Sequence, residues 1–321
     1  MLDGFFHKFG LHGKSFIPLV TGFGCSVPAY MAARTLKNER DRLLTLFIIG
    51  FMSCGARLPI YVLFIGAFFG DEDAGNWLFL IYMTGAMLGL ISAKILHLYV
   101  FKGEDEPFVM EMPKYRMPSM KLIWHTVYGQ GKSYINKAGT FILLASMLVW
   151  FASNYPKQHE LEAQYSIKIE KSVDENMSIK LSNELAEKSL EMSYLGQIGH
   201  ASSWFFSPLG LDWKMSVALE TGLAAKEVVV STLGVLYSLG ENNDETSSSL
   251  RDELRKNISL PSAIAFIVFV MIYLPCLAAS MVFAREAGGW KYLVYLFIFT
   301  TSTAWILSFI AYNVTKLILG V

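Results

Sequence analysis

The sequence predicts an all-α membrane protein that crosses the bilayer several times. Of its 321 residues, 53% are hydrophobic and only 17% are charged, and the formal net charge is zero. Several apolar runs reach the roughly 20 residues that a helix needs to cross a hydrocarbon core about 30 Å thick. Polar segments separate these runs, which is the pattern of a polytopic helical protein.

Full membrane spans are expected where an apolar run is long and uninterrupted. The shortest of the expected spans, residues 134–153, has a shorter apolar core but contains Trp150, a residue type suited to the membrane interface. We expect about five full spans: residues 43–69, 77–101, 134–153, 263–284 and 292–319.

Two further apolar segments are interrupted by small and polar residues. Residues 16–33 contain GFGCSVP, and residues 213–239 contain ETGLAAKEVVVSTLG. Irregular backbone is tolerated at membrane depth only where protein or a water-lined cavity satisfies its polar groups. We therefore expect two gate-like segments, either re-entrant or broken helices, and we expect them to carry function.

The order of these segments suggests an inverted repeat. An interrupted segment, a span with cysteine and proline, and a plain span occur before residue 101 and again after residue 213. An odd number of crossings between the copies would invert one relative to the other. We divide the chain into residues 1–101 (first gate segment and two spans), 102–153 (a loop and one span), 154–212 (a polar extramembrane insertion) and 213–321 (second gate segment and two spans).

The orientation is predicted from positively charged loops. RTLKNERDR, at residues 34–42, is the clearest cluster of lysine and arginine, so this loop should be cytoplasmic. The polar stretch at residues 154–195 should then lie outside. The balanced charge and the lack of a basic patch disfavour a nucleic-acid partner.

The first cysteine lies in a glycine-rich break. Gly24 loosens the backbone beside Cys25, and Pro28 suits the first turn of a new helix. A thiol near a helix N-terminus favours its thiolate, the form that binds metals. An inert cysteine in a tight packing turn explains the same residues about equally well.

The other two cysteines lie beside prolines within apolar runs. Cys54 precedes Pro59, which should free the carbonyl of Gly55, and Pro275 directly precedes Cys276. Kinked helices with small interface residues would account for both. That all three cysteines lie at expected helix breaks favours a pathway for a metal ion, because thiolates and freed carbonyls can share its coordination.

Charged residues within the apolar runs need a partner or a wet cavity. Arg57 costs at least about 2.5 kcal/mol at the centre of a span. Glu220 and Glu227 are candidate counter-charges, and on a continuous helix they would share one face. Glu227 could also contribute charge to a cation path, whereas Lys226 and Glu227 could instead be a snorkelling interfacial pair.

Two short motifs mimic a phosphate-binding loop without its spacing. HGKS at residues 12–15 has Lys8 where the first glycine is required, and GQGKS at residues 129–133 has Thr126 there. We therefore expect no nucleotide site. No nucleophile with a matching base and no histidine–glutamate metal motif is visible, so an intramembrane enzyme is disfavoured.

At this point the sequence resembles the FeoB family of bacterial ferrous-iron permeases. GLHGKSFIPLVTGFGCSVPAYMAARTL and RDRLLTLFIIGFMSCGARLPIYVLF are similar to the first gate region and core of the family. LAAKEVVVSTLGVLY, YLPCLAA and AREAGGWK are similar to its second gate region. The resemblance covers most of the membrane portion, in the right order, but not the insertion at residues 154–195.

The resemblance implies Fe(II) import across the bacterial cytoplasmic (inner) membrane, with Fe(II) as substrate and no permanent cofactor. It matches Cys25, Cys54 and Cys276 to the family's membrane cysteines and Glu227 to its gate-region glutamate. Members normally begin with a GTPase domain that these residues do not include. We therefore expect a separately encoded GTPase portion and small Feo accessory proteins as partners, besides lipid; a homo-oligomer is also compatible.

Other functions remain open from the sequence. A permease for another divalent metal or a nucleoside-like solute could use the same gate-like architecture. A truncated remnant that does not transport is a further alternative. Transport, rather than enzymatic catalysis, is the reading that the residues favour.

Overall fold

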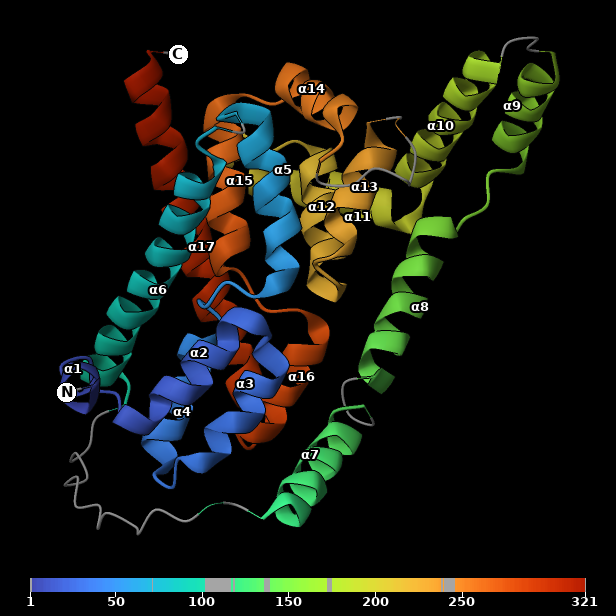
Figure 1. The fold of residues 1–321 in the computed structure, drawn as a ribbon. Coiled ribbons are helices and arrows are strands. Elements are labelled where there is room, and N and C mark those ends of the chain that lie inside the picture. Colours follow the sequence, from blue (N-terminus) through green and yellow to red (C-terminus); the bar gives the residue numbers. More distant parts are fainter. Residues whose placement is uncertain are drawn as a thin grey trace.

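The computed structural model describes residues 2–70, 72–101, 117, 119–135, 139–171, 175–237, 239 and 246–320, and the regular elements over these residues are all helical (Figure 1). This agrees with the predicted all-α class. Within the described residues, three helical runs are long and apolar enough to cross a membrane: Ala74–Tyr99, Leu260–Glu286 and Trp290–Leu319.

The first half of the chain contains two broken helical segments followed by one continuous helix. The break expected in residues 16–33 is confirmed, and the run at residues 43–69 is also broken rather than one continuous helix. The elements are α1 (Leu2–His7), η1 (Gly13–Ser15), α2 (Phe16–Gly24), α3 (Ser26–Ala32), η2 (Ala33–Thr35), α4 (Glu39–Ile49), η3 (Gly55–Arg57), α5 (Leu58–Phe68) and α6 (Ala74–Tyr99).

The last part of the chain repeats this order. The break expected in residues 213–239 is confirmed, and a second break divides residues 260–286 into two helices. The elements are α12 (Trp213–Ala224), α13 (Val228–Leu236), α14 (Ser248–Asn257), α15 (Leu260–Ile272), α16 (Leu277–Glu286) and α17 (Trp290–Leu319).

The two copies run in opposite directions through the bundle. In Figure 1, α2, α3 and α4 of the first copy lie in the lower half with α16, whereas α5 lies in the upper half with α12, α13 and α15. The pairs α2–α3 and α12–α13 each form a hairpin that enters and leaves at one end. The two hairpins thus come from opposite ends of the bundle, as an inverted repeat requires.

Two polar parts of the chain lie at opposite ends of the bundle. The connection from α3 to α4 lies at the lower end, and α9 and α10, from the middle of the chain, project from the upper end (Figure 1). The expected opposite placement of residues 34–42 and 154–195 therefore agrees with the fold. The elements are α7 (Met120–Tyr134), α8 (Thr140–Asn154), α9 (His159–Lys171), α10 (Glu175–Met192), α11 (Tyr194–Phe206) and η5 (Ser207–Leu209).

Side-chain caps and early prolines explain where the half-helices begin. The side chain of Asn38 accepts the Arg40 amide at 2.9 Å before α4, and that of Asp212 accepts the Met215 amide at 2.8 Å before α12. Pro59 lies in the first turn of α5, where a backbone N–H would have no acceptor within the helix, so the missing N–H costs no helical hydrogen bond.

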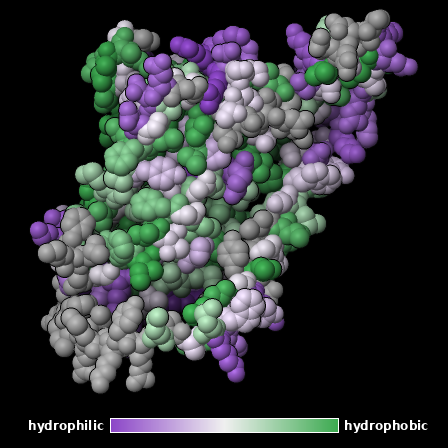
Figure 2. All heavy atoms as spheres, viewed as in Figure 1, coloured by the Kyte–Doolittle hydropathy of each residue, from purple (hydrophilic) through white to green (hydrophobic). Residues whose placement is uncertain are grey.

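The surface has the polarity of a membrane protein. Figure 2 shows apolar residues gathered over the middle of the face and hydrophilic residues near its ends and on the projecting hairpin. Many large apolar side chains of α6 and α17 are exposed, such as Phe79, Met87 and Ile298. The fold thus presents apolar side chains outwards at the depth where lipid would lie.

Candidate functional site

Four helix breaks meet near the middle of the bundle, and we refer to them as the four breaks. Two interrupt the hairpins, at residue 25 and at residues 225–227. Two interrupt the crossing segments, at residues 50–54 and 273–276. All three cysteines lie in them, as the glycines and prolines of the sequence predict.

The hairpin breaks share one backbone geometry. Cys25 has φ −153° and ψ 132°, and Ala225 has φ −149° and ψ 116°. Each amide donates at 3.1 Å to the carbonyl of a threonine four residues earlier, Thr21 or Thr221. Both threonines are followed by glycine in the sequence. This Thr-Gly signal relates the two copies by residue identity as well as by order, and the sequence analysis missed it.

The crossing breaks also correspond to each other. Cys54 has φ −75° and ψ 161°, and Cys276 has φ −55° and ψ 157°; each is the last non-helical residue before a new helix. In the inverted repeat, Cys54 is therefore equivalent to Cys276. By the same comparison, Cys25 is equivalent to Ala225.

Contacts around two glycines show which breaks lie next to each other. A Cβ added to Gly55 would lie 3.5 Å from the carbonyl oxygen of Gly24. One added to Gly50 would lie 3.9 Å from Cδ of Pro275. The break at residue 25 thus adjoins that at 50–54, which in turn adjoins that at 273–276.

The fourth break joins the cluster through Tyr273. A Cβ added to Gly222, one turn before Ala225, would lie 2.5 Å from the Tyr273 hydroxyl oxygen. Only glycine permits the second hairpin to approach the aromatic ring this closely. The four breaks therefore form one contiguous region rather than separate kinks.

Arg57 ties the two crossing breaks together. Its side chain is 1% exposed and donates to the carbonyl oxygens of Gly50 at 3.2 Å, Met52 at 3.4 Å and Tyr273 at 3.3 Å. Carbonyls left without a helical donor are costly in an apolar interior, and the guanidinium supplies several donors at once. Arg57 thus satisfies backbone groups that the breaks expose.

One expectation about this region was wrong. The carbonyl of Gly55 is not free, because it accepts the Leu58 amide within the 3₁₀ turn before α5. The irregular backbone therefore lies before Pro59, and not at the hydrogen bond that this proline lacks. Arg57 has partners, as a buried charge requires, but they are backbone carbonyls and not the candidate counter-charges Glu220 and Glu227.

Lys226 is buried in the second hairpin break. Its side chain is 1% exposed, and its Nζ lies 3.8 Å from the centroid of the Tyr273 ring. Within the described part of the chain, this nitrogen has no hydrogen-bond partner. It interacts electrostatically with Arg57, Cys54 and Cys276. The terminal nitrogen lies over an aromatic face, with the geometry of a cation–π contact, and not in the snorkelling pair that the sequence allowed.

The two candidate glutamates occupy different environments. Glu220 and Glu227 do not share a helix face, because α12 ends between them. Glu220 accepts a hydrogen bond from Ser202 of α11 at 2.6 Å, and its other carboxylate oxygen is buried without a partner among the described residues. Glu227 is exposed, and it interacts electrostatically with Cys25 and Cys276.

The three thiols lie in adjoining breaks without forming a finished metal site. Cys25, Cys54 and Cys276 are half-buried free cysteines that interact electrostatically with one another. Over the described residues, no group of three or more His, Cys, Asp or Glu side chains is arranged to hold a metal. Pro28, in the first turn of α3, and Gly24, at the end of α2, frame Cys25 as expected.

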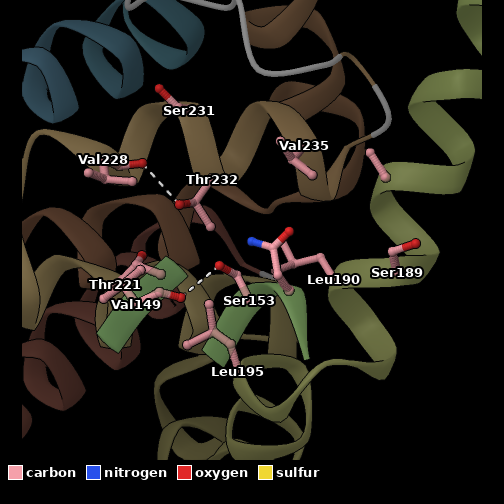
Figure 3. Close-up of a pocket in the computed structure, with 12 residues that line it drawn as sticks. Val149, Ser153, Ser189, Leu190, Leu195, Thr221, Val228, Ser231, Thr232 and Val235 are labelled. Atoms are coloured by element: carbon pink, nitrogen blue, oxygen red, sulfur yellow. Dashed lines mark hydrogen bonds between the residues drawn. The ribbon is translucent and has the colours of Figure 1, made fainter. Parts of the chain in front are cut away.

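A cavity of about 470 Å³, lined by polar and apolar side chains alike, adjoins the second hairpin (Figure 3). Thr221 and Val228, on the two sides of the break, line one wall, and Ser153 of α8 and Ser189 of α10 line others. Hydroxyl groups make this cavity suitable for water. It connects the surroundings of the break with the inserted helix α10.

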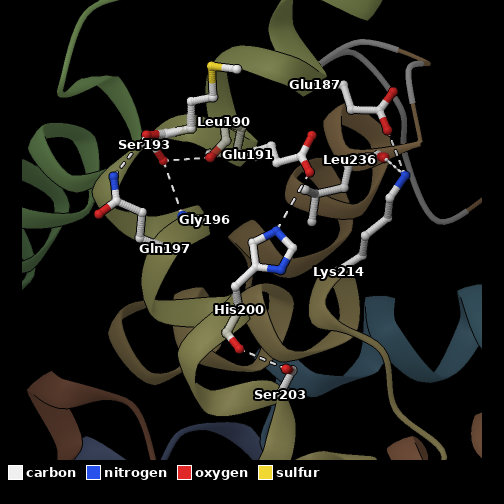
Figure 4. A network of polar contacts seen from close by, with 11 residues as sticks. Glu187, Leu190, Glu191, Ser193, Gly196, Gln197, His200, Ser203, Lys214 and Leu236 are labelled. Carbon is white, nitrogen blue, oxygen red and sulfur yellow. Dashed lines mark hydrogen bonds and ion pairs between the residues drawn. The ribbon is translucent and has the colours of Figure 1, made fainter.

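A network of polar contacts holds the inserted helices to the second hairpin (Figure 4). Nζ of Lys214 donates at 2.6 Å to both Glu187 of α10 and the carbonyl of Leu236 at the end of α13. His200 lies 3.6 Å from Glu191, between the nearest nitrogen and oxygen atoms, and stacks on Trp213 with ring centroids 4.4 Å apart. The insertion is thus attached at one wall of the cavity.

Two family models together match most of the chain. The Gate model, described as "Nucleoside recognition", matches residues 1–68 and 135–290. The model of the ferrous iron transport protein B C terminus matches residues 78–129. The matched residues include all of the four breaks. No solved structure matches the chain.

Several similar proteins are named Fe(2+) transporter FeoB. Those of Campylobacter jejuni and Helicobacter pylori strain J99 are 59% and 54% identical over 100% and 99% of this chain, which covers 49% and 51% of their lengths. A Fe(2+) transport protein A/Fe(2+) transporter FeoB fusion protein of Porphyromonas gingivalis is 43% identical over 98% of the chain and 39% of its own length. The chain spans about half the length of its first two relatives. The chain therefore belongs to the Gate family, and over its whole length it is similar to about half of the length of proteins named Fe(2+) transporter FeoB.

Proposed function

We propose that this chain forms the permeation path of a bacterial ferrous-iron uptake transporter, with Fe(II) passing through the region of the four breaks. The observation that carries the proposal is that Cys25, Cys54 and Cys276 all lie in the four breaks, which adjoin one another. Substrate sites of inverted-repeat transporters lie at such breaks near the repeat interface.

The available donors suit a divalent transition metal. Thiolates are soft ligands, and Fe(II) is a borderline cation that accepts both sulfur and oxygen donors. Glu227 would add negative charge at the exposed side of the same region.

The proposed setting is the bacterial cytoplasmic membrane. The relatives named Fe(2+) transporter FeoB extend well beyond this chain, and a GTPase portion outside it would energise or regulate transport. The Porphyromonas gingivalis fusion joins a relative of this chain to Fe(2+) transport protein A, which supports a small Feo accessory protein as partner. The chain itself would transport rather than catalyse.

The test measures Fe(II) uptake by the complete assembly in an iron-starved host or in proteoliposomes. Cys25→Ser, Cys276→Ser and Glu227→Gln should each lower uptake while the amount of inserted protein stays unchanged. Serine keeps the size of the side chain but loses the soft thiolate. Wild-type uptake by all three variants would show that these residues are packing elements.

Metal selectivity tests the main alternative. Mn(II) or Zn(II) taken up as fast as Fe(II), and competing with it, would favour a permease for another divalent metal. Uptake of a radiolabelled nucleoside that is insensitive to the cysteine substitutions would favour the nucleoside-like alternative. Thiolate donors also bind Zn(II) strongly, so the competition experiment, rather than the type of donor, separates these metals.

A further inference from the structure

The helix α7, Met120–Tyr134, presents large apolar side chains that the bundle does not cover. Every side chain of this helix that the structure describes is exposed, and the helix lies at the lower end of the bundle, below α8 (Figure 1). Trp124 is 74% exposed, and Val127 and Tyr128 are about as open. Large apolar side chains are costly to leave in water, so this helix calls for a partner.

The apolar side chains of α7 form one face, which we call the apolar face. They follow the spacing i, i+3, i+4, i+7 and i+8, which places them on one side of a helix. Leu122 lies outside this face. The members of the apolar face are Met120, Ile123, Trp124, Val127 and Tyr128, and all of them are exposed.

Positive charge borders the apolar face on one side. Lys121 and Lys132 are eleven residues apart, close to three full turns, so they lie on the same side of the helix, with His125 between them. The sequence of α7 contains no Asp or Glu. Both lysines are exposed, and among the described residues neither forms an ion pair. This edge of the helix is therefore complementary to anionic groups.

A hollow in the surface lies where the apolar face meets this basic edge. It has a volume of about 320 Å³ and is lined by Tyr128, Gly131, Lys132 and Ile135. Gly131 leaves the helix surface open here, because an added Cβ would have no heavy atom within 4 Å outside its own helix and its chain neighbours. A hollow lined by apolar and cationic groups together suits an amphiphile with an apolar chain and an anionic headgroup.

The place of α7 in the fold favours the membrane as its partner. The next helix, α8, presents exposed apolar side chains such as Leu144, Leu148 and Trp150. The lower end of the bundle also holds the connection from α3 to α4, whose lysine and arginine residues predict the cytoplasmic side (Figure 1). The cytoplasmic leaflet carries anionic lipid. Acyl chains and anionic headgroups would therefore both lie within reach of α7.

We propose that α7 is an interfacial helix, with its apolar face among the acyl chains of the cytoplasmic leaflet and with Lys121 and Lys132 at anionic headgroups. The proposal goes beyond the iron path and does not depend on it. In this arrangement α7 lies along the membrane surface and α8 crosses the membrane. The interfacial helix thus fixes the point at which α8 enters the bilayer.

The depth of α7 can be measured with nitroxide labels on the purified chain in nanodiscs of phosphatidylcholine and phosphatidylglycerol. Gly131→Cys and Gly129→Cys are a matched pair, because the two positions lie on opposite sides of the helix and both have open space for a Cβ. A label at residue 131 should be reached by oxygen, which concentrates in lipid, more readily than by a water-soluble nickel chelate. A label at residue 129 should show the reverse order.

Two further measurements support this comparison. The wild-type chain, taken through the same labelling, gives the background from its three native cysteines. Val127→Cys, on the apolar face, and His125→Cys, on the basic side, repeat the comparison should a glycine variant fail to fold.

The role of the lysines is measured with the label at residue 131, whose spectrum separates immersed from free helix. Lys121→Gln/Lys132→Gln in the anionic nanodiscs should lower the ratio of immersed to free helix at least about fivefold, and nanodiscs of phosphatidylcholine alone should do the same to the wild type. Lys157→Gln/Lys171→Gln removes two exposed lysines at the upper end of the molecule and should leave the ratio unchanged.

Three results would overturn the proposal. Equal access of the nickel chelate to residues 129 and 131 would place the whole helix in water. Low access of both oxygen and the chelate to residue 131 would show that protein, such as a second copy of the chain, covers the apolar face. A ratio of immersed to free helix that responds neither to the lysines nor to anionic lipid would remove the anionic leaflet as the partner.

Discussion

The guanidinium of Arg34 forms a two-pronged ion pair with the carboxylate of Glu286, joining the end of the first hairpin to the end of α16. Arg34 belongs to the 3₁₀ turn after α3, and Glu286 is the last residue of α16. The helices α3 and α16 also pack against each other. The pair therefore fastens the two inverted copies at the lower end of the bundle.

This ion pair should be measurable by charge exchange. Glu286→Arg should lower the midpoint of thermal unfolding, and the double variant Arg34→Glu/Glu286→Arg should recover part of the loss. The expected coupling is about 0.5–1 kcal/mol, because Arg34 is partly exposed and solvent screens the pair. A double-mutant cycle by thermal unfolding in detergent gives the value, and strictly additive effects would contradict a direct pair.

The close approach at Gly222 predicts a sharp steric effect. In Gly222→Ala, the new Cβ would lie 2.5 Å from the Tyr273 hydroxyl oxygen and 2.9 Å from Cγ2 of Val229. Both neighbours are buried, so we expect a loss of about 1–3 kcal/mol of stability from overpacking. Thermal unfolding of the purified variant measures it.

The inverted repeat supplies the matched control. A Cβ added to Gly24 would have no heavy atom within 4 Å, other than those of its own helix and its chain neighbours. The equivalent residue of the second copy is Ala224, which already carries a Cβ. Gly24→Ala should therefore change the unfolding midpoint little. Equal losses in Gly24→Ala and Gly222→Ala would show that backbone conformation, rather than contact with Tyr273, explains the effect.

Arg57 should be needed for the fold of the crossing breaks. Arg57→Met leaves three buried carbonyls without this donor, and each can cost about 1–3 kcal/mol. Arg57→Lys restores charge but not the broad fork of donors, so it should recover only part of the stability. Arg255→Met, at an exposed position of α14, is the control. Comparable expression and unfolding midpoints for Arg57→Met and the control would disprove this role.

Topology can be tested with a membrane-impermeant maleimide on intact cells. Cysteines introduced at Lys37 and Lys157, both exposed, should lie on opposite sides of the membrane, with position 157 labelled from outside. The wild-type chain reports the background from its half-buried native cysteines. Labelling of both positions from the same side would be incompatible with the inverted arrangement in Figure 1.

The purified chain should not bind GTP. Neither HGKS nor GQGKS has the glycine spacing that cradles phosphates. Residues 13–15 form a 3₁₀ turn, and GQGKS lies within α7. Isothermal titration should show no heat of binding at micromolar nucleotide, and a micromolar affinity removed by Lys14→Ala would refute the expectation.

The helix breaks could be predicted because their cause is local. Glycine and proline around Cys25, Cys54 and Cys276 disfavour continuous helix whatever surrounds them. Where each break falls was less predictable. Pro59 became an early residue of α5, so the irregular backbone moved upstream of the position that its missing hydrogen bond suggested.

The environments of the charged residues could not be predicted because their partners come from distant parts of the chain. Lys226 is covered by the ring of Tyr273, and Arg57 reaches the carbonyl of the same residue. Spacing along the sequence instead suggested a shared face for Glu220 and Glu227, which fails once the helix ends between them. Local pattern located this region, whereas tertiary packing decided which charges were buried.

The equivalence of Cys25 and Ala225 makes a nearly symmetric backbone chemically one-sided. The two hairpins present the same turn to the centre from opposite ends, but one offers sulfur where the other offers only a methyl group. An ion approaching from either direction would meet the same shape and a different affinity. On the proposed path, an ion would therefore find a sulfur donor at only one of the two hairpins.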